Sequence, residues 1–189
     1  TYNISSNFDP TLTPDGNILF SSVQANGSRA GGKGRVMLCV DNWDGAYPRP
    51  IYGNCDEEIG GASCKSQAKI TFGDRKLVYV ESPYMNWGVG QLAAVSWDAP
   101  YNKTYEKLSK DEGGLYRSPY PLPDDRMLVS YAERGDFGIY WFDCKNGKAG
   151  ELVHNDPEWN DHQPAPIYIK YKPRWINTFT AGKNFGVTT

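Results

Sequence analysis

The sequence lacks the motifs by which several classes of protein are recognised. It holds only 2 histidines and 4 cysteines in 189 residues, and none of them forms a Cys-x-x-Cys-His motif or a paired Cys/His zinc pattern. A covalently attached c-type haem is therefore excluded within this chain, and no metal site is predicted. No Gly-x-Ser-x-Gly motif occurs either. The sequence thus assigns no catalytic residue.

An excess of one charge and a long apolar run are also missing. The 20 Lys and Arg residues face 22 Asp and Glu residues, for a net charge of −2. Nucleic-acid-binding domains usually carry a basic excess, so no nucleic-acid partner is predicted. Without a run of about 18 apolar residues, no membrane span is predicted. The chain does hold 39% hydrophobic and 14% aromatic residues, which is enough for a packed core.

Turn-forming residues are frequent, with 20 glycines and 13 prolines, and they punctuate an internal repeat. Three turn aspartates, Asp15, Asp74 and Asp124, recur 59 and 50 residues apart, and each precedes a short apolar run rich in β-forming residues. These runs are Ile18–Phe20, Leu77–Val80 and Met127–Val129. Each unit is predicted to form strand, tight turn, strand, variable loop, strand, turn, strand. The weaker fourth strands are expected near Arg49–Tyr52, Tyr105–Leu108 and Gly150–Val153.

The repeat predicts an all-β fold of about three four-stranded blades of a β-propeller. The expected blade units cover residues 9–54, 64–112 and 116–160, and residues 161–189 hold the start of a further strand and an exit segment. No segment has a convincing helical period, although one turn could form within Tyr101–Leu108. Closed propellers have about four to eight blades. We therefore expect a part of a larger propeller of about six to eight blades, completed by the parent chain or by another subunit.

The cysteines give one disulfide candidate. Cys55 and Cys64 flank a polar, glycine-containing loop, and a disulfide there would stabilise the fold by about 2–3 kcal/mol. Two unpaired thiols are the alternative. Cys39 and Cys144 lie inside apolar, strand-like runs and are predicted to be small core residues. A disulfide would fit an extracytoplasmic compartment, which is the location we expect.

Aromatic residues in expected loops and at strand ends are the candidates for ligand or partner binding. Such side chains can stack on sugars or bury a protein interface, although packing between blades is the alternative. The candidates are Trp43, Tyr84, Trp87, Tyr120, Trp159 and His162.

The third unit resembles a known family. The stretches 118–131, 137–140, 151–158 and 163–167 are similar to the family of hydrazine synthase α-subunits and their bacterial relatives. The triplet Pro14-Asp15-Gly16 is also similar to the turn repeats of TolB-type propellers.

The resemblance implies a large exported protein in which a propeller lies beside domains that carry c-type haem. Those haems need Cys-x-x-Cys-His, which this chain lacks, so no catalytic residue is transferred to it. The implied function is a non-catalytic propeller segment that acts as scaffold and interaction surface in a multihaem redox complex. The haem c would then lie in partner domains. A propeller that binds carbohydrate or peptide through its loop aromatics is the alternative.

Overall fold

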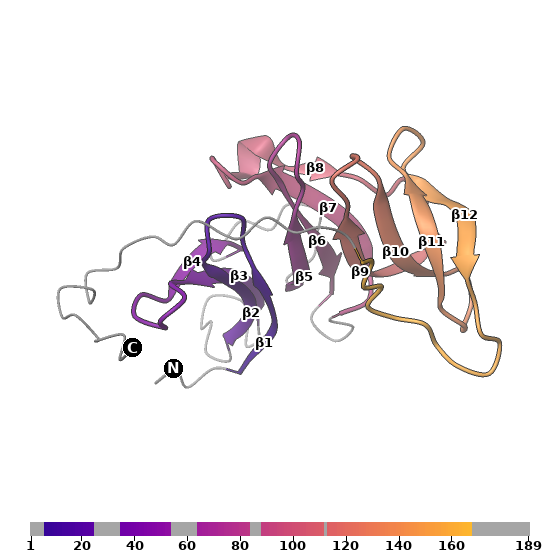
Figure 1. Cartoon of the computed structure of the whole chain (residues 1–189), viewed down its shortest axis with the longest axis horizontal. Coiled ribbons are helices and arrows are strands. Elements are labelled where there is room, and N and C mark those ends of the chain that lie inside the picture. The colour runs from indigo at the N-terminus through magenta and orange to yellow at the C-terminus, as the bar shows by residue number, and fades with distance from the viewer. Residues whose placement is uncertain (1–5, 25–34, 54–63, 84–87, 112, 168–189) are drawn as a thin grey trace, which may run out of the picture.

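The computed structural model describes residues 6–24, 35–53, 64–83, 88–111 and 113–167. Within these ranges the chain forms three consecutive antiparallel units of four strands, which we call blades 1, 2 and 3 (Figure 1). Blade 1 consists of β1 (Asn7–Leu12), β2 (Ile18–Gln24), β3 (Arg35–Asp41) and β4 (Arg49–Tyr52). Blade 2 consists of β5 (Cys64–Ile70), β6 (Lys76–Ser82), β7 (Gln91–Ser96) and β8 (Glu106–Lys107). Blade 3 consists of β9 (Leu115–Pro121), β10 (Met127–Ala132), β11 (Gly138–Asp143) and β12 (Lys148–His154). The predicted all-β fold is confirmed.

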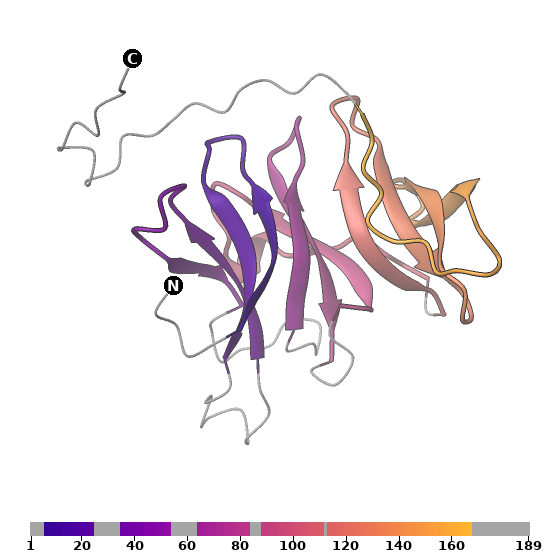
Figure 2. The same cartoon turned by 60° about the horizontal axis from the view of Figure 1, so that its bottom comes forward.

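Backbone pairing joins each blade to the next. Blades 1 and 2 are joined by one parallel pair, Val36 with Cys64. Blades 2 and 3 are joined by an antiparallel bridge between Gly90 and Tyr116, in which each N–H donates to the other carbonyl. The three blades fan out from one side and do not close into a ring (Figure 2). A 3-10 turn, η2 (Asn102–Thr104), precedes β8, where one helical turn was expected. Among the described residues, no helix is long and apolar enough to cross a membrane.

The repeated turn between the first two strands explains why the three units share one sequence pattern. Gly16, Arg75 and Asp125 occupy the same position in it and have φ values of 84°, 49° and 62°. The aspartate before each supplies a short polar side chain, which favours such turns. In blade 2, the Thr71 hydroxyl donates to Asp74 Oδ1 at 2.5 Å and accepts the Lys76 N–H at 2.7 Å. The local turn chemistry therefore sets the length of each hairpin.

The core lies between the blades, and strand β6 contributes to both interfaces. Successive side chains of a strand point to opposite faces of the sheet. Leu77 and Tyr79 therefore pack in the cluster that faces blade 1, and Val78 and Val80 in the cluster that faces blade 3. A strand buried on both faces has a continuous apolar sequence rather than an alternating one. This explains the apolar run of the second unit.

The cysteine predictions have different outcomes. Cys39 is buried in β3, as predicted. The prediction for Cys144 is wrong, because this residue is exposed in the turn after β11. The Asp143 carboxylate accepts hydrogen bonds from the backbone N–H groups of Lys145 and Asn146. These bonds form a turn, so β11 ends before Cys144. Cys64 is buried at the start of β5, and Cys55 lies outside the described residues, so the disulfide stays a prediction.

After β12, residues 155–167 cross blade 3 and return beside β9 (Figures 1 and 2). The Asp161 N–H donates to Phe137 O at 2.6 Å, and the Phe137 N–H donates to Asn160 Oδ1 at 3.1 Å. These bonds fix the connection to the start of β11. Residues 161–167 form no strand in the described structure, and the rest of the expected exit segment lies outside it.

Tyr116 offers a test of the packing between blades 2 and 3. The ring of Tyr116 is fully buried. Its hydroxyl group donates a hydrogen bond to the Asp111 carboxylate at 2.9 Å and accepts one from the Ala149 N–H at 2.9 Å. Tyr116→Phe should lower the free energy of unfolding by about 1–3 kcal/mol, because it leaves two polar groups without their partner. Tyr101→Phe, at a ring that is 62% exposed, is the matched control. Denaturant unfolding of the intact protein measures both, and equal effects would contradict the assigned role of Tyr116.

Candidate functional site

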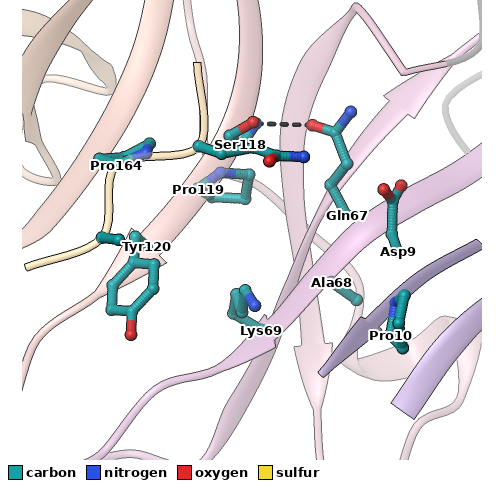
Figure 3. A pocket seen from close by; sticks show the side chains of 11 residues that line it. Asp9, Pro10, Gln67, Ala68, Lys69, Ser118, Pro119, Tyr120 and Pro164 are labelled. Carbon is teal, nitrogen blue, oxygen red and sulfur yellow. Dashed lines mark hydrogen bonds between the residues drawn. The ribbon is translucent and has the colours of Figure 1, made fainter. Parts of the chain in front are cut away.

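A cavity of about 440 Å³ lies where the first strands of the three blades come together. The close-up in Figure 3 shows side chains from β1, β5, β9 and the connection after β12 around it. Its lining residues are Asp9, Pro10, Gln67, Ala68, Lys69, Ser118, Pro119, Tyr120, Gln163, Pro164 and Ala165. Each of the four segments thus contributes an equivalent short stretch of chain.

The four stretches share an unusual backbone conformation. Asp9, Gln67, Ser118 and Gln163 have φ values of 53°, 55°, 47° and 54°. A left-handed conformation is uncommon for residues other than glycine and costs about 1–2 kcal/mol. In β1, β5 and β9 this residue coincides with a β-bulge, where the pairing with the second strand is interrupted. The bulge therefore turns the same residue of each blade toward the cavity.

Hydrogen bonds link these residues from one blade to the next. The backbone N–H of Gln67 donates to the Asp9 carboxylate. The backbone N–H of Ser118 donates to Gln67 Oε1 at 2.6 Å, as the dashed line in Figure 3 shows. The other end of the Gln67 amide, Nε2, donates to Gly88 O at 3.1 Å. Gln67 thus holds its own blade, blade 3 and the segment before β7 together.

The cavity contains both a carboxylate and an ammonium group. Partial burial raises the pKa of Asp9, and the Gln67 N–H, Lys69 and Arg117 oppose this shift. Lys69 Nζ donates to Thr11 Oγ1 at 2.8 Å and lies 5.6 Å from the centroid of the Tyr120 ring. The cavity could therefore bind a polar ligand through the Lys69 ammonium group and the partly desolvated Asp9 carboxylate. No group of three or more His, Cys, Asp or Glu residues that could hold a metal occurs among the described residues.

The raised pKa of Asp9 predicts a pH dependence. The folded protein keeps the Asp9 carboxyl protonated to a higher pH than the unfolded chain does. The contribution of this carboxyl to the free energy of unfolding is therefore complete below its ordinary pKa of 3.8, and it is lost as the pH rises through the pKa of the folded state. Asp9→Asn cannot ionise and still offers an oxygen to the Gln67 N–H. We expect the variant to gain stability over the original protein at neutral pH, and the gain to shrink toward pH 4. Thermal unfolding across pH measures this, and a gain independent of pH would contradict it.

The structure brings one of the predicted interaction residues, Tyr120, into the cavity. Trp43 lies in the turn between β3 and β4 and is 48% exposed, whereas Trp159, in the connection after β12, is 71% exposed. His162 is exposed, and its ring packs edge-on against Phe137 at a centroid distance of 6.1 Å. Tyr84 and Trp87 lie outside the described residues. Among the described candidates, Trp43 thus belongs to blade 1, whereas Tyr120, Trp159 and His162 belong to blade 3 and the connection that follows it.

Sequence reasoning missed the other residues of the cavity, including Asp9, Gln67 and Ser118. A signal was present, because Asp9-Pro10, Ser118-Pro119 and Gln163-Pro164 repeat a polar residue followed by proline at the start of successive units. Proline has no N–H to donate to a neighbouring strand, so this repeat marks an interruption of the sheet. Comparing the first strands of the units would have pointed to these positions.

Comparison with solved structures defines the class of protein. The chain matches a puromycin hydrolase structure with a TM-score of 0.58 and 16% identity, over 84% of this chain and 25% of the other. It matches the β-propeller domain of the Trilobed protease from Pyrococcus furiosus with a TM-score of 0.50 and 13% identity, over 82% of this chain and 44% of that one. At such low identity, these matches show the fold alone. The described residues are three blades of a β-propeller.

A far closer similarity identifies the relationship of this particular sequence. The chain is 86% identical over 188 residues to hydrazine synthase subunit alpha of Kuenenia stuttgartiensis. This match covers 100% of the present chain and 23% of the relative. It matches the structure of Kuenenia stuttgartiensis hydrazine synthase with a TM-score of 0.88, over 24% of that chain. No protein family model matches. The resemblance to the hydrazine synthase α-subunit is confirmed along the whole chain, which spans about a quarter of the relative's length.

Proposed function

We propose that this chain is a non-catalytic propeller segment of a hydrazine-synthase-α-like protein in an extracytoplasmic compartment. It serves as scaffold and interaction surface for a multihaem redox complex. The observation that carries the proposal is the 86% identity over the whole chain to the hydrazine synthase α-subunit. Since the chain has no Cys-x-x-Cys-His motif, the haem c belongs to partner domains and the chemistry takes place outside this segment.

The flank of blade 3 supports a scaffold that continues into further blades. Leu152 and Val153 of β12 are 50% and 47% exposed, and Leu115 of β9 is 42% exposed. Blades 1 and 2 bury equivalent apolar faces against their neighbours. A further blade, supplied by the longer protein, would cover the flank of blade 3 in the same way.

The proposal is tested on the protein purified from its natural source. We expect peptides of this sequence in a particle with a native mass well above 21.1 kDa, together with a Soret absorbance band. A colourless monomer of 21.1 kDa would contradict both the redox complex and the incomplete propeller. Peptide mapping without reductant on the same sample tests the compartment, because a Cys55–Cys64 cross-link fits an oxidising environment.

The exposure of Trp159 favours a second candidate, binding of carbohydrate or peptide by loop aromatics. A tryptophan that is 71% exposed offers a flat apolar face for a sugar ring. Trp159→Ala should then abolish binding on a glycan or peptide array, whereas Trp43→Ala, in another blade, should leave it unchanged. Binding that survives Trp159→Ala would exclude Trp159 as the residue that binds the ligand.

A further inference from the structure

We propose that the left-handed residues of the first strands form a hydrogen-bond ladder that sets the register between blades, and that Gln163 is its open acceptor for the next blade. The contacts of the ladder among Asp9, Gln67 and Ser118 lie within the described residues. The partner of Gln163 rests on the proposed function, in which the longer protein supplies further blades. The occupant is therefore a first strand whose left-handed residue presents its backbone N–H to the Gln163 side chain.

The two observed contacts run in the same direction. Asp9 of blade 1 accepts the N–H of Gln67 in blade 2, and Gln67 accepts the N–H of Ser118 in blade 3. In each case a side-chain oxygen of one left-handed residue meets the backbone N–H of the equivalent residue in the next blade. A repeated contact between equivalent residues indicates a device of the fold rather than a chance pairing.

The bulge makes the N–H available for this contact. In β5 the pairing with β6 is interrupted between Ser66 and Lys69, and in β9 the pairing with β10 is interrupted between Arg117 and Tyr120. Gln67 and Ser118 lie inside these gaps, so their N–H groups are released from the sheet. A released N–H that is partly buried needs another acceptor. The side chain of the preceding blade provides it, which compensates the cost of the left-handed backbone.

Gln163 repeats the features of Gln67. It is the same residue type at the equivalent position, with a φ of 54° against 55°. Its side chain is exposed and makes no hydrogen bond with the described part of the chain. The Ser118 hydroxyl forms no such bond with Gln163, since a serine side chain is much shorter than that of glutamine. The long amide of Gln163 restores the reach that Gln67 has toward a following blade.

The ladder is tested at Gln67 in the intact protein by hydrogen exchange resolved at single amides. In Gln67→Met, which removes the acceptor but keeps the length, the Ser118 amide should exchange roughly tenfold faster. In Gln67→Glu an oxygen still faces Ser118, so the protection of this amide should be retained although the bond to Gly88 O is lost. Unchanged exchange at Ser118 in Gln67→Met would overturn the ladder.

The open end is tested with Gln163→Met, Gln163→Glu and the control Glu158→Met, an exposed change in the same connection. We expect an amide outside residues 1–167 to exchange roughly tenfold faster in Gln163→Met alone. If the native mass is large and no such amide responds, the role of Gln163 is wrong while the proposed function stands. If the isolated protein is a 21.1 kDa monomer, the proposed function fails, and the ladder is decided by Gln67 alone.

Discussion

Lys65→Met is expected to lower the free energy of unfolding by about 3–5 kcal/mol, because it leaves a buried carboxylate without its counter-charge. Lys65 and Glu81 are cross-strand partners in β5 and β6, with 3.5 Å between Nζ and Oε1 and side chains only 7% and 5% exposed. The Tyr105 hydroxyl donates to the other oxygen of Glu81 at 2.8 Å. The carboxylate is thus held by one ammonium and one hydroxyl group.

The double variant separates the charge from the packing. In Lys65→Met with Glu81→Gln no charge is buried, and the amide oxygen can still accept from Tyr105. We expect this variant to recover most of the lost stability, since neutral replacements of buried ion pairs are often tolerated. Lys76→Met is the surface control, because the pair of Lys76 with Glu106 is exposed and should contribute less than about 1 kcal/mol. Denaturant unfolding of the intact protein measures all three, and a double variant as unstable as Lys65→Met would contradict the electrostatic explanation.

The same pair predicts how the loss depends on pH. Burial raises the pKa of Glu81, against the opposing effects of the Tyr105 hydroxyl and Lys65. Without Lys65 this pKa rises further, and the stability of the variant is full below the unfolded pKa and lost as the pH rises through the folded one. The deficit of Lys65→Met should therefore be smaller at pH 5 than at pH 8. Thermal unfolding at both values checks this, and a deficit that grows on acidification would contradict it.

Gly90→Ala should cost about 3–5 kcal/mol, since it forces apart the backbones that join blades 2 and 3. The Gly90 N–H donates to Tyr116 O at 3.1 Å and Gly90 O accepts the Tyr116 N–H at 2.8 Å. A Cβ at Gly90 would collide with the backbone carbonyl oxygen of Glu81 and lie 2.9 Å from the Cβ of Ser82. Neither neighbour can yield without moving β6, so the bridge to Tyr116 should open.

Gly113→Ala is the matched control, because a Cβ there meets no atom within 4 Å. Its effect should stay within about 0.5 kcal/mol. Denaturant unfolding of the intact protein gives the two free energies, and hydrogen exchange at the Tyr116 amide reports whether the bridge has opened. A Tyr116 amide that remains protected in Gly90→Ala would show that blades 2 and 3 tolerate the added methyl group.

The repeat could be predicted because its signals are local. The apolar run Leu77–Val80 and the turn around Asp74 appear in the structure as β6 and the hairpin before it. The fourth strand of blade 1 has the expected bounds, Arg49–Tyr52. The wrong prediction for Cys144 also has a local cause. The apolar run before it suggested that the strand continues, whereas the Asp143 carboxylate starts a turn there.

The cavity could not be predicted in the same way. Nothing in the sequence near Gln67 shows that its side chain meets the backbone of Ser118, which lies 51 residues further along the chain. Loop aromatics such as Trp43 and Trp159 are conspicuous in the sequence, yet Trp43 lies between β3 and β4 of blade 1 and Trp159 lies after β12 of blade 3. The abundance of aromatic residues in the expected loops therefore did not predict a shared binding surface.

The three four-stranded units, the approximate positions of their strands and the resemblance to the hydrazine synthase α-subunit follow from the order of the amino acids alone. Turn residues and apolar runs act over a few residues, so their pattern is readable without a structure. The meeting of Asp9, Gln67 and Ser118 and the joint burial of Lys65 and Glu81 become visible only once the chain is folded. Such contacts form when neighbouring blades pack and exclude water, and the burial that gives these polar groups their energy comes from residues far away in the chain.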